Sequence, residues 1–192
     1  MRIPPKIGAE GFEQVASWAA TVGLDVLDVP RLTPEVKEAC QKNNLEIGTV
    51  DIAHTAQLFS LDEAKRADAV EKYKKQMTTI ADLGGRVLFI CLVPEDHTLP
   101  RMDAFEILKE TFPEIIRHAE DLDLYIAIEG WPGPAPYYPT LGCTPETLRA
   151  MFNAIPSKHF GMTFDPSHLV RLGIDYIRVM SEFGERINHC HG

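Results

Sequence analysis

The sequence predicts an α/β fold built on a parallel sheet. Short apolar runs typical of strands alternate along the 192 residues with amphipathic stretches typical of helices, and this alternation is the pattern of consecutive βαβ units. The composition fits an ordinary globular protein, because 45% of the residues are hydrophobic and 24% are charged. We therefore expect residues 1–192 to form a single domain with a sizeable core.

Seven runs have the length and apolar content of strands, and they lie near 2–7, 24–29, 45–52, 86–93, 124–129, 159–164 and 186–191. A closed TIM (β/α)8-type barrel has eight strands and about 250 residues. The chain therefore fits such a barrel in an incomplete, C-terminally truncated form, with about seven βα units and its last strand at the C-terminus. An open doubly wound sheet shows the same alternation and stays an alternative.

Helical stretches separate these runs, and several of their ends carry recognisable signals. Segments 33–35 and 144–146 both read Thr-Pro-Glu, which offers a capping hydroxyl, a proline for the first helical position and an acid that complements the helix dipole. Ser60 and Glu63 have the spacing of a capping box at the start of a long helix. Pro113 lies inside a further helical pattern and should kink or split it, because proline lacks the N–H that the turn requires.

The charge balance argues against a polyanionic partner. The formal net charge is −9, from 28 acidic and 19 basic residues, and no block of lysine and arginine stands out. DNA or an anionic membrane surface would be repelled by such a chain. We expect no nucleic-acid partner.

Cysteine usage and the apolar runs indicate a cytosolic protein. The four cysteines are widely spaced without a C-x-x-C pair, and Cys91 lies inside an apolar run, which suggests buried or idle thiols in a reducing compartment. The start, MRIPPKIGAE, lacks the apolar core of a signal peptide, and the run 87–93 is too short to cross a bilayer. No membrane association is expected.

Possible metal ligands follow three of the predicted strands. By strand alternation, Glu129 and Asp165 lie on the face opposite the bulky apolar residues of their strands, and His189 and His191 share one face of the last strand. In a barrel these side chains would point into the lumen at the C-terminal rim, where such folds keep their active sites. Two carboxylates and one or two imidazoles suit a divalent cation with mixed oxygen and nitrogen ligands.

Each of these residues also has an ordinary structural explanation. Asp165 precedes a proline and is a good helix N-cap, and Glu129 would pair with a basic neighbour in many proteins. His168 would be a hydrogen-bonded residue with no ligand role, and His189 and His191 would be part of a frayed terminus. The common position of the candidates, each at the end of an apolar strand, favours the metal site.

Three stretches resemble a known family: IAIEGWPGP at 126–134, GMTFDPSHLVRLGIDYI at 161–177 and RINHCHG at 186–192. They look like the sugar isomerase/epimerase family with the xylose-isomerase-like TIM barrel, which includes ketose 3-epimerases, hydroxypyruvate isomerases and inositol-catabolic isomerases and dehydratases. The βα rhythm resembles this family over most of the chain, whereas the specific motifs lie in its second half.

The resemblance implies roles for particular residues. Glu129 and Asp165 would bind the metal together with the histidine of the H-x-H pair, for which the match favours His191 over His189. His168 would face the substrate or lie close to the metal. The family's fourth ligand is a glutamate on the eighth strand, which this sequence does not contain, so weak metal binding and poor turnover are expected of residues 1–192 alone.

The family's chemistry is proton abstraction next to a carbonyl through an enediolate that a divalent metal stabilises. The resemblance implies an isomerase or epimerase of a small sugar or polyol ketone, with Glu129 as both ligand and base. Mn²⁺ is the favoured ion, with Mg²⁺, Co²⁺ or Zn²⁺ as alternatives. The competing hypotheses are a metal-dependent lyase or phosphodiesterase on the same barrel and a non-catalytic incomplete barrel.

Residues outside the ligand set are candidates for substrate contact. His54 and Asp28 follow earlier strands at rim positions, and Trp131 lies in the loop 130–143 directly beyond Glu129. A surface role for the first two and simple loop packing for the tryptophan are the alternatives. An exposed edge at the last strand would invite association between chains, so a homo-oligomer is expected.

Overall fold

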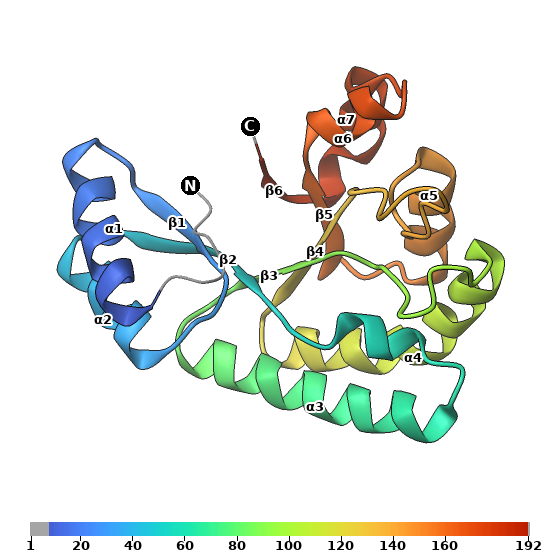
Figure 1. The fold of residues 1–192 in the computed structure, drawn as a ribbon, viewed down its shortest axis with the longest axis horizontal. Helices are drawn as coiled ribbons and strands as arrows, with labels where there is room; N and C mark the ends of the chain where they lie inside the picture. Colours follow the sequence, from blue (N-terminus) through green and yellow to red (C-terminus); the bar gives the residue numbers. More distant parts are fainter. Residues whose placement is uncertain (1–7, 192) are drawn as a thin grey trace.

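The computed structural model describes residues 8–191 (Figure 1). Its strands form a single parallel sheet. The six strands of this sheet are hydrogen-bonded in sequence order: β1 (Val26–Val29), β2 (Glu46–Asp51), β3 (Val87–Ile90), β4 (Tyr125–Glu129), β5 (Phe160–Phe164) and β6 (Ile187–Cys190). The strands predicted near 24–29, 45–52, 86–93, 124–129, 159–164 and 186–191 are therefore confirmed. The strand expected at 2–7 lies outside the described residues.

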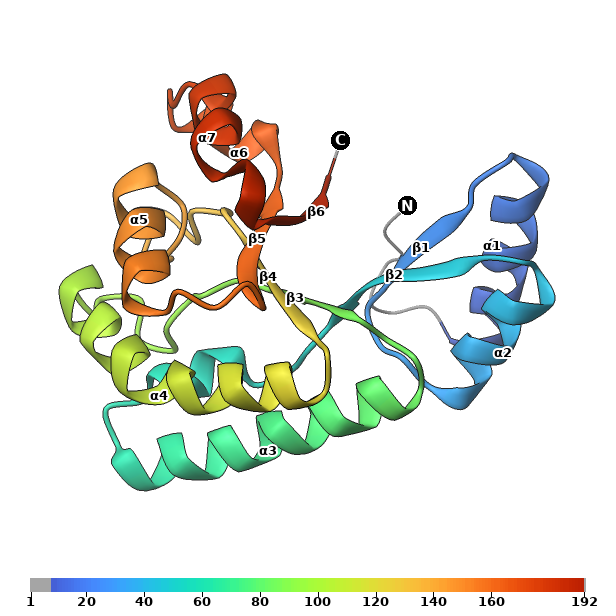
Figure 2. The same ribbon diagram turned by 180° about the vertical axis from the view of Figure 1, so that it is seen from behind.

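Helix α1 (Ala9–Thr21) precedes β1, and the other helices connect each strand to the next. They are α2 (Pro34–Lys42), η1 (Thr55–Phe59), α3 (Glu63–Asp82), α4 (Arg101–Asp121), α5 (Pro145–Ala154), α6 (Pro166–Arg171), α7 (Tyr176–Phe183) and the 3-10 turn η2 (Gly184–Arg186). Figures 1 and 2 show them around the outside of the strands, with α1 and α2 beside β1 and β2, and α5 to α7 beside the later strands.

The strand order decides between the two architectures that the sequence allowed. A doubly wound sheet reverses its strand order at a switch point, whereas the strands of a TIM barrel follow one another around the sheet. Here every neighbouring pair is parallel and consecutive in the chain. The fold is an incomplete (β/α)8-type barrel, and the open doubly wound alternative is wrong.

The apolar face of the strands packs against the helices. On β4, Ile126 and Ile128 are fully buried, as are Leu88 on β3 and Phe160 on β5. The opposite face carries smaller and more polar side chains, such as Thr163. The face of the sheet with bulky apolar side chains therefore packs against the helices, and the opposite face carries polar groups at the strand ends.

A β-bulge bends β6 where it pairs with β5. Met162 pairs with Ile187 but Thr163 pairs with His189, so Asn188 is an extra residue of β6. The Asn188 side chain passes over Gly161 and its Nδ2 donates to the Ile126 carbonyl at 3.4 Å. A Cβ at Gly161 would lie 2.3 Å from the backbone carbonyl oxygen of Arg186 and 2.5 Å from that Nδ2, so this close approach of β6 requires glycine.

Two of the three predicted helix starts are confirmed. The hydroxyl of Thr33 accepts a hydrogen bond from Val36 N–H at the start of α2, and Thr144 forms a capping box with Thr147 at the start of α5. The capping box predicted at Ser60 is wrong. Asp62 caps α3 instead, because its carboxylate accepts from two backbone N–H groups of the first turn.

Pro113 was predicted to kink or split its helix, and the split does not occur, whereas the kink stays a prediction. Helix α4 continues through the proline from Arg101 to Asp121. An interior proline costs a helix about 3 kcal/mol, but Phe112 and Ile115 on either side are fully buried. Burying each such side chain contributes about 1.5–3 kcal/mol, so packing on the sheet offsets the lost hydrogen bond.

The segment 130–143 forms the long loop that its composition predicts, with one isolated bridge between Leu92 and Leu141. Within residues 8–191, every helix is too short or too polar to cross a bilayer. The expectations of a single domain and of a homo-oligomer stay predictions.

Candidate metal centre

Three strand ends bring two carboxylates and an imidazole together. Glu129 is the last residue of β4, Asp165 directly follows β5, and His191 directly follows β6. The three strands are adjacent and parallel, so their carboxyl ends meet at one edge. His191 Nδ1 lies 3.0 Å from Glu129 Oε1 and 3.9 Å from Asp165 Oδ2, and one possible ligand atom from each residue lies within 4.8 Å of the others.

Glu129 has histidine and thiol neighbours. Its Oε1 contacts His191, and its Oε2 accepts a hydrogen bond from Cys91 Sγ at 3.4 Å. Among residues 8–191, the basic side chains within 4 Å of Glu129 are those of His168 and His191, with no lysine or arginine. The carboxylate is therefore not neutralised by an ordinary basic residue of the described chain.

Cys91 was missed as a site residue, because its apolar run suggested an idle thiol. It directly follows β3 and is half-buried beside Glu129. Its position immediately after a strand, which it shares with Asp165 and His191, was the available signal. The thiol donates to the second oxygen of the glutamate and lies beside the candidate site.

Asp165 combines the two roles that the sequence set against each other. Its Oδ1 accepts a hydrogen bond from Ser167 N–H at 2.8 Å and caps α6, while its Oδ2 faces His168 and His191. Burial opposes ionisation of this carboxyl, but hydrogen bonds from Ser167, together with the electrostatic influence of His168 and His191, hold its pKa below the usual value. One oxygen caps the helix and the other is directed at the site.

The first turn of α6 places His168 over both carboxylates. Its Nε2 is 3.7 Å from Glu129 Oε1 and 3.7 Å from Asp165 Oδ2. These separations exceed a hydrogen bond but are typical of atoms that face a common point. The imidazole therefore lies close to both carboxylates of the cluster.

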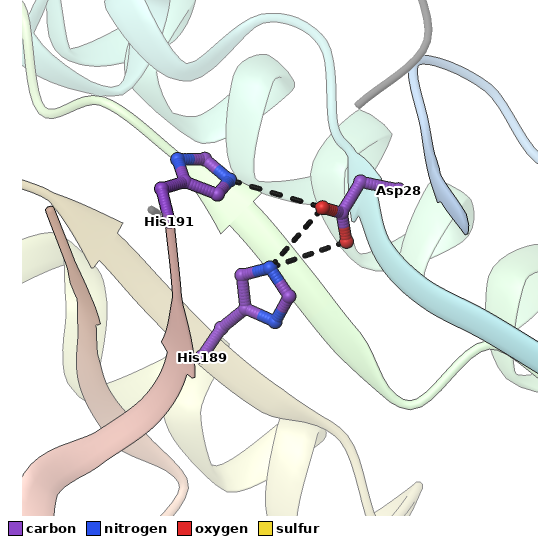
Figure 3. Close-up of side chains that lie close together, drawn as sticks. All are labelled: Asp28, His189 and His191. Atoms are coloured by element: carbon purple, nitrogen blue, oxygen red, sulfur yellow. Dashed lines mark hydrogen bonds and ion pairs between the residues drawn. The ribbon is translucent and has the colours of Figure 1, made fainter. Parts of the chain in front are cut away.

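A second cluster lies next to the first and shares His191 (Figure 3). Asp28 on β1 is 5% exposed, and His189 Nε2 lies 3.2 Å from both of its oxygens. Asp28 Oδ1 also accepts from the backbone N–H of Thr49 at 2.8 Å and from its hydroxyl at 3.0 Å. The contact between Asp28 and His189 joins the first and last strands of the described sheet, so His189 is not part of a frayed terminus.

The environment of Asp28 predicts that the protein loses stability at low pH. Burial alone would raise the pKa of this carboxyl, but hydrogen bonds from His189 and Thr49 outweigh burial and lower the pKa to about 2. A carboxyl whose pKa is lower in the folded protein than in the unfolded chain stabilises the fold at any pH above its unfolded-state pKa. This stabilisation is lost as the pH falls through the folded-state pKa, here from about pH 4 towards pH 2. We expect a loss of about 2 kcal/mol in the free energy of unfolding over this range.

Denaturant unfolding of the metal-free protein across this pH range measures that loss. Asp28→Asn should flatten the pH dependence, whereas Asp25→Asn, on an exposed residue of the same segment, should leave it unchanged. Equal pH profiles for wild type and Asp28→Asn would contradict the prediction.

Of the residues predicted to contact a substrate, His54 lines a cavity that the cluster does not share. His54 is exposed, has a positive φ of 69° and lines a cavity of about 980 Å³ between α3 and the loops after β1 and β2. None of Glu129, Asp165 and His191 lines that cavity. Trp131 is half-buried in the loop two residues beyond Glu129. Their contact with a substrate stays a prediction.

Known proteins share this architecture. The crystal structure of 3-keto-D-glucoside 4-epimerase from E. coli has a TM-score of 0.79 at 14% identity and covers 100% of this chain and 76% of its own. D-psicose 3-epimerase in the presence of D-fructose has a TM-score of 0.79 at 17% identity and covers 97% and 68%. At these identities the likeness shows the fold alone.

Sequence comparison agrees with the structural comparison. The inosose dehydratase of Bacillus thuringiensis (strain Al Hakam) is 22% identical over 209 residues, which cover 97% of this chain. The chain spans 65% of the length of that dehydratase. Residues 5–192 match the family model described as the xylose isomerase-like TIM barrel, and the chain therefore belongs to that family.

Proposed function

We propose that the protein is a metal-dependent isomerase or epimerase of a small sugar or polyol ketone. The observation that carries this proposal is the convergence of Glu129, Asp165 and His191, with ligand atoms within 4.8 Å of one another at the carboxyl ends of three adjacent strands. In TIM barrels this end of the sheet holds the active site.

The donor set fits a divalent cation. Bonds of about 2.0–2.2 Å from oxygen and nitrogen to a common ion place neighbouring ligand atoms about 3 Å apart, and the separations from His191 Nδ1 are 3.0 and 3.9 Å. Two half-buried carboxylates without a lysine or arginine partner among residues 8–191 present negative charge to one point. Mixed carboxylate and imidazole ligation is compatible with Mn²⁺, which we favour, and with Mg²⁺, Co²⁺ or Zn²⁺ as alternatives.

Side chains of the protein would carry out proton transfer and orient the substrate. A bound divalent cation would supply Lewis acidity that stabilises an enediolate. Glu129 is the carboxylate placed to take the proton next to the substrate carbonyl, and the Cys91 thiol holds its second oxygen in orientation. His168 is too far from both carboxylates to be engaged by a hydrogen bond, so its ring can donate to a substrate oxygen.

The relatives support a small ketone substrate. Their names refer to D-psicose, L-ribulose, 3-keto-D-glucoside and inosose. All four carry a carbonyl beside hydroxyl groups, which is the arrangement that proton abstraction through an enediolate requires. We infer a substrate of the same class here.

Metal content and proton exchange test the proposal together. We expect about one divalent ion per chain after dialysis against Mn²⁺, and ion-dependent incorporation of deuterium from D₂O at the carbon next to the carbonyl of at least one ketose in a panel. Mass spectrometry and NMR measure both results. A protein that binds no ion and exchanges no proton with any ketose would sink the proposal.

A lyase that eliminates water is the second candidate, because the similarity to inosose dehydratase extends over 97% of this chain. Elimination begins with the same proton abstraction, so the two candidates use Glu129 in the same way. Product mass separates them, since an epimer keeps the mass of the substrate and a dehydration product has lost one water.

A further inference from the structure

His191 has a second ring nitrogen that no hydrogen bond satisfies. Its Nδ1 faces Glu129 and Asp165, whereas its Nε2 is buried and has no hydrogen-bond partner among the described residues. The carboxylate facing this nitrogen is that of Asp28, whose Oδ2 lies 3.9 Å away (Figure 3). A shift of about 1 Å would bring the pair to hydrogen-bond distance.

Asp28 is held in a fixed orientation. The backbone and hydroxyl of Thr49 both donate to Oδ1, and His189 Nε2 lies within 3.2 Å of each oxygen. Because the carboxylate is almost wholly buried and anchored from β2 and β6, it cannot swing away from His191 without breaking these bonds. The anchored anion therefore presents an acceptor to His191.

We infer that Asp28 is a positioning residue for the metal ligand His191, which it controls by accepting the Nε2–H bond. An imidazole with its proton on Nε2 has its lone pair on Nδ1, the nitrogen that faces Glu129 and Asp165. Histidines that bind metals commonly donate their other N–H to a carboxylate, which fixes the tautomer and the ring orientation. This inference rests on the proposed metal site and extends it to an outer residue.

His189 supports Asp28 and does not replace His191. Its ring packs edge-on against that of His191, with centroids 5.2 Å apart, and its Nε2 points at the carboxylate. Asp28, His189 and His191 are also close enough to hold an ion of their own. That arrangement would require both nitrogens of His191 to bind ions at once if the first site is filled, so we favour the positioning role and make the second ion an outcome of the test.

The test compares Asp28→Asn with wild type and with Asp25→Asn as the matched control on an exposed residue of the same segment. We expect Mn²⁺ affinity, measured by isothermal titration calorimetry, to fall about 10–100-fold in Asp28→Asn, as for other outer residues of metal sites. In the metal-free protein, two-bond ¹H–¹⁵N NMR correlations should show His191 protonated on Nε2 in wild type and a mixture of tautomers in the variant.

Thr49→Val provides a second variant should Asp28→Asn not fold, because it removes one anchor of the carboxylate and keeps the side-chain shape. It should show the same two changes in smaller degree. Circular dichroism confirms that each variant is folded before its affinity is interpreted.

The outcomes separate the inference from the proposed function. Wild type that binds Mn²⁺ with an Asp28→Asn variant of equal affinity and unchanged tautomer would overturn the inference alone. Two ions per chain, with one lost in His189→Ala, would make Asp28 a ligand and also overturn it. Wild type that binds no ion would sink the metal site, while an Asp28-dependent tautomer would still support the contact between Asp28 and His191.

Discussion

Replacing Glu129 by glutamine is expected to lower kcat/KM for proton exchange by about 10³-fold or more. The glutamine keeps the size of the side chain but removes the negative charge and the basic oxygen. A general base typically contributes about 10²–10⁴-fold, and the proposed loss of a metal ligand adds to that effect. Deuterium incorporation into the ketose identified in the panel measures the change, with Mn²⁺ in excess to limit the contribution of weaker binding.

Glu110→Gln is the control for this experiment. Glu110 lies on α4, its side chain is 69% exposed, and its ion pair with Arg66 is far from the strand ends. It should exchange at the wild-type rate. Exchange by Glu129→Gln within a few-fold of wild type would remove Glu129 from the mechanism, even if the protein still binds a metal.

Two substitutions of Asp165 are expected to separate its capping role from its proposed ligand role. Serine is a good N-cap but offers no second carboxylate oxygen, whereas alanine offers neither group. Asp165→Ser should keep the stability of α6 and lose Mn²⁺ affinity by more than about 100-fold, beyond the effect of an outer residue. Asp165→Ala should show the same loss of Mn²⁺ affinity. It should also lose about 1 kcal/mol in the free energy of unfolding, within the range of about 0.5–2 kcal/mol for removal of an N-cap.

Calorimetric titration with Mn²⁺ and denaturant unfolding of the metal-free protein measure the two effects independently. Asp175 provides a matched comparison, because its carboxylate caps α7 with bonds to Ile177 N–H and Arg178 N–H and belongs to neither cluster of possible ligands. Asp175→Ala should lose stability without losing affinity. A serine variant at 165 that binds Mn²⁺ as tightly as wild type would show that this residue is a cap only.

Local sequence patterns were sufficient to predict the six described strands and most of the proposed ligand set. The apolar runs placed the six described strands because a strand buried beneath helices must be almost continuously apolar. The alternation within β4 and β5 put Glu129 and Asp165 on the face opposite their bulky neighbours, since the side-chain period of a strand is two. Strand order in the sheet then followed from a resemblance that the family model confirms.

Contacts between distant segments were beyond those patterns. Asp28 and His189 are 161 residues apart, and they meet because the curved sheet brings β1 and β6 to face each other, with the bulge at Asn188 bending β6. Cys91 reaches Glu129 only through the pairing of β3 with β4. The continuity of α4 through Pro113 likewise depends on tertiary burial. Periodicity reports which face a side chain occupies, but the curvature of the sheet decides which side chains meet.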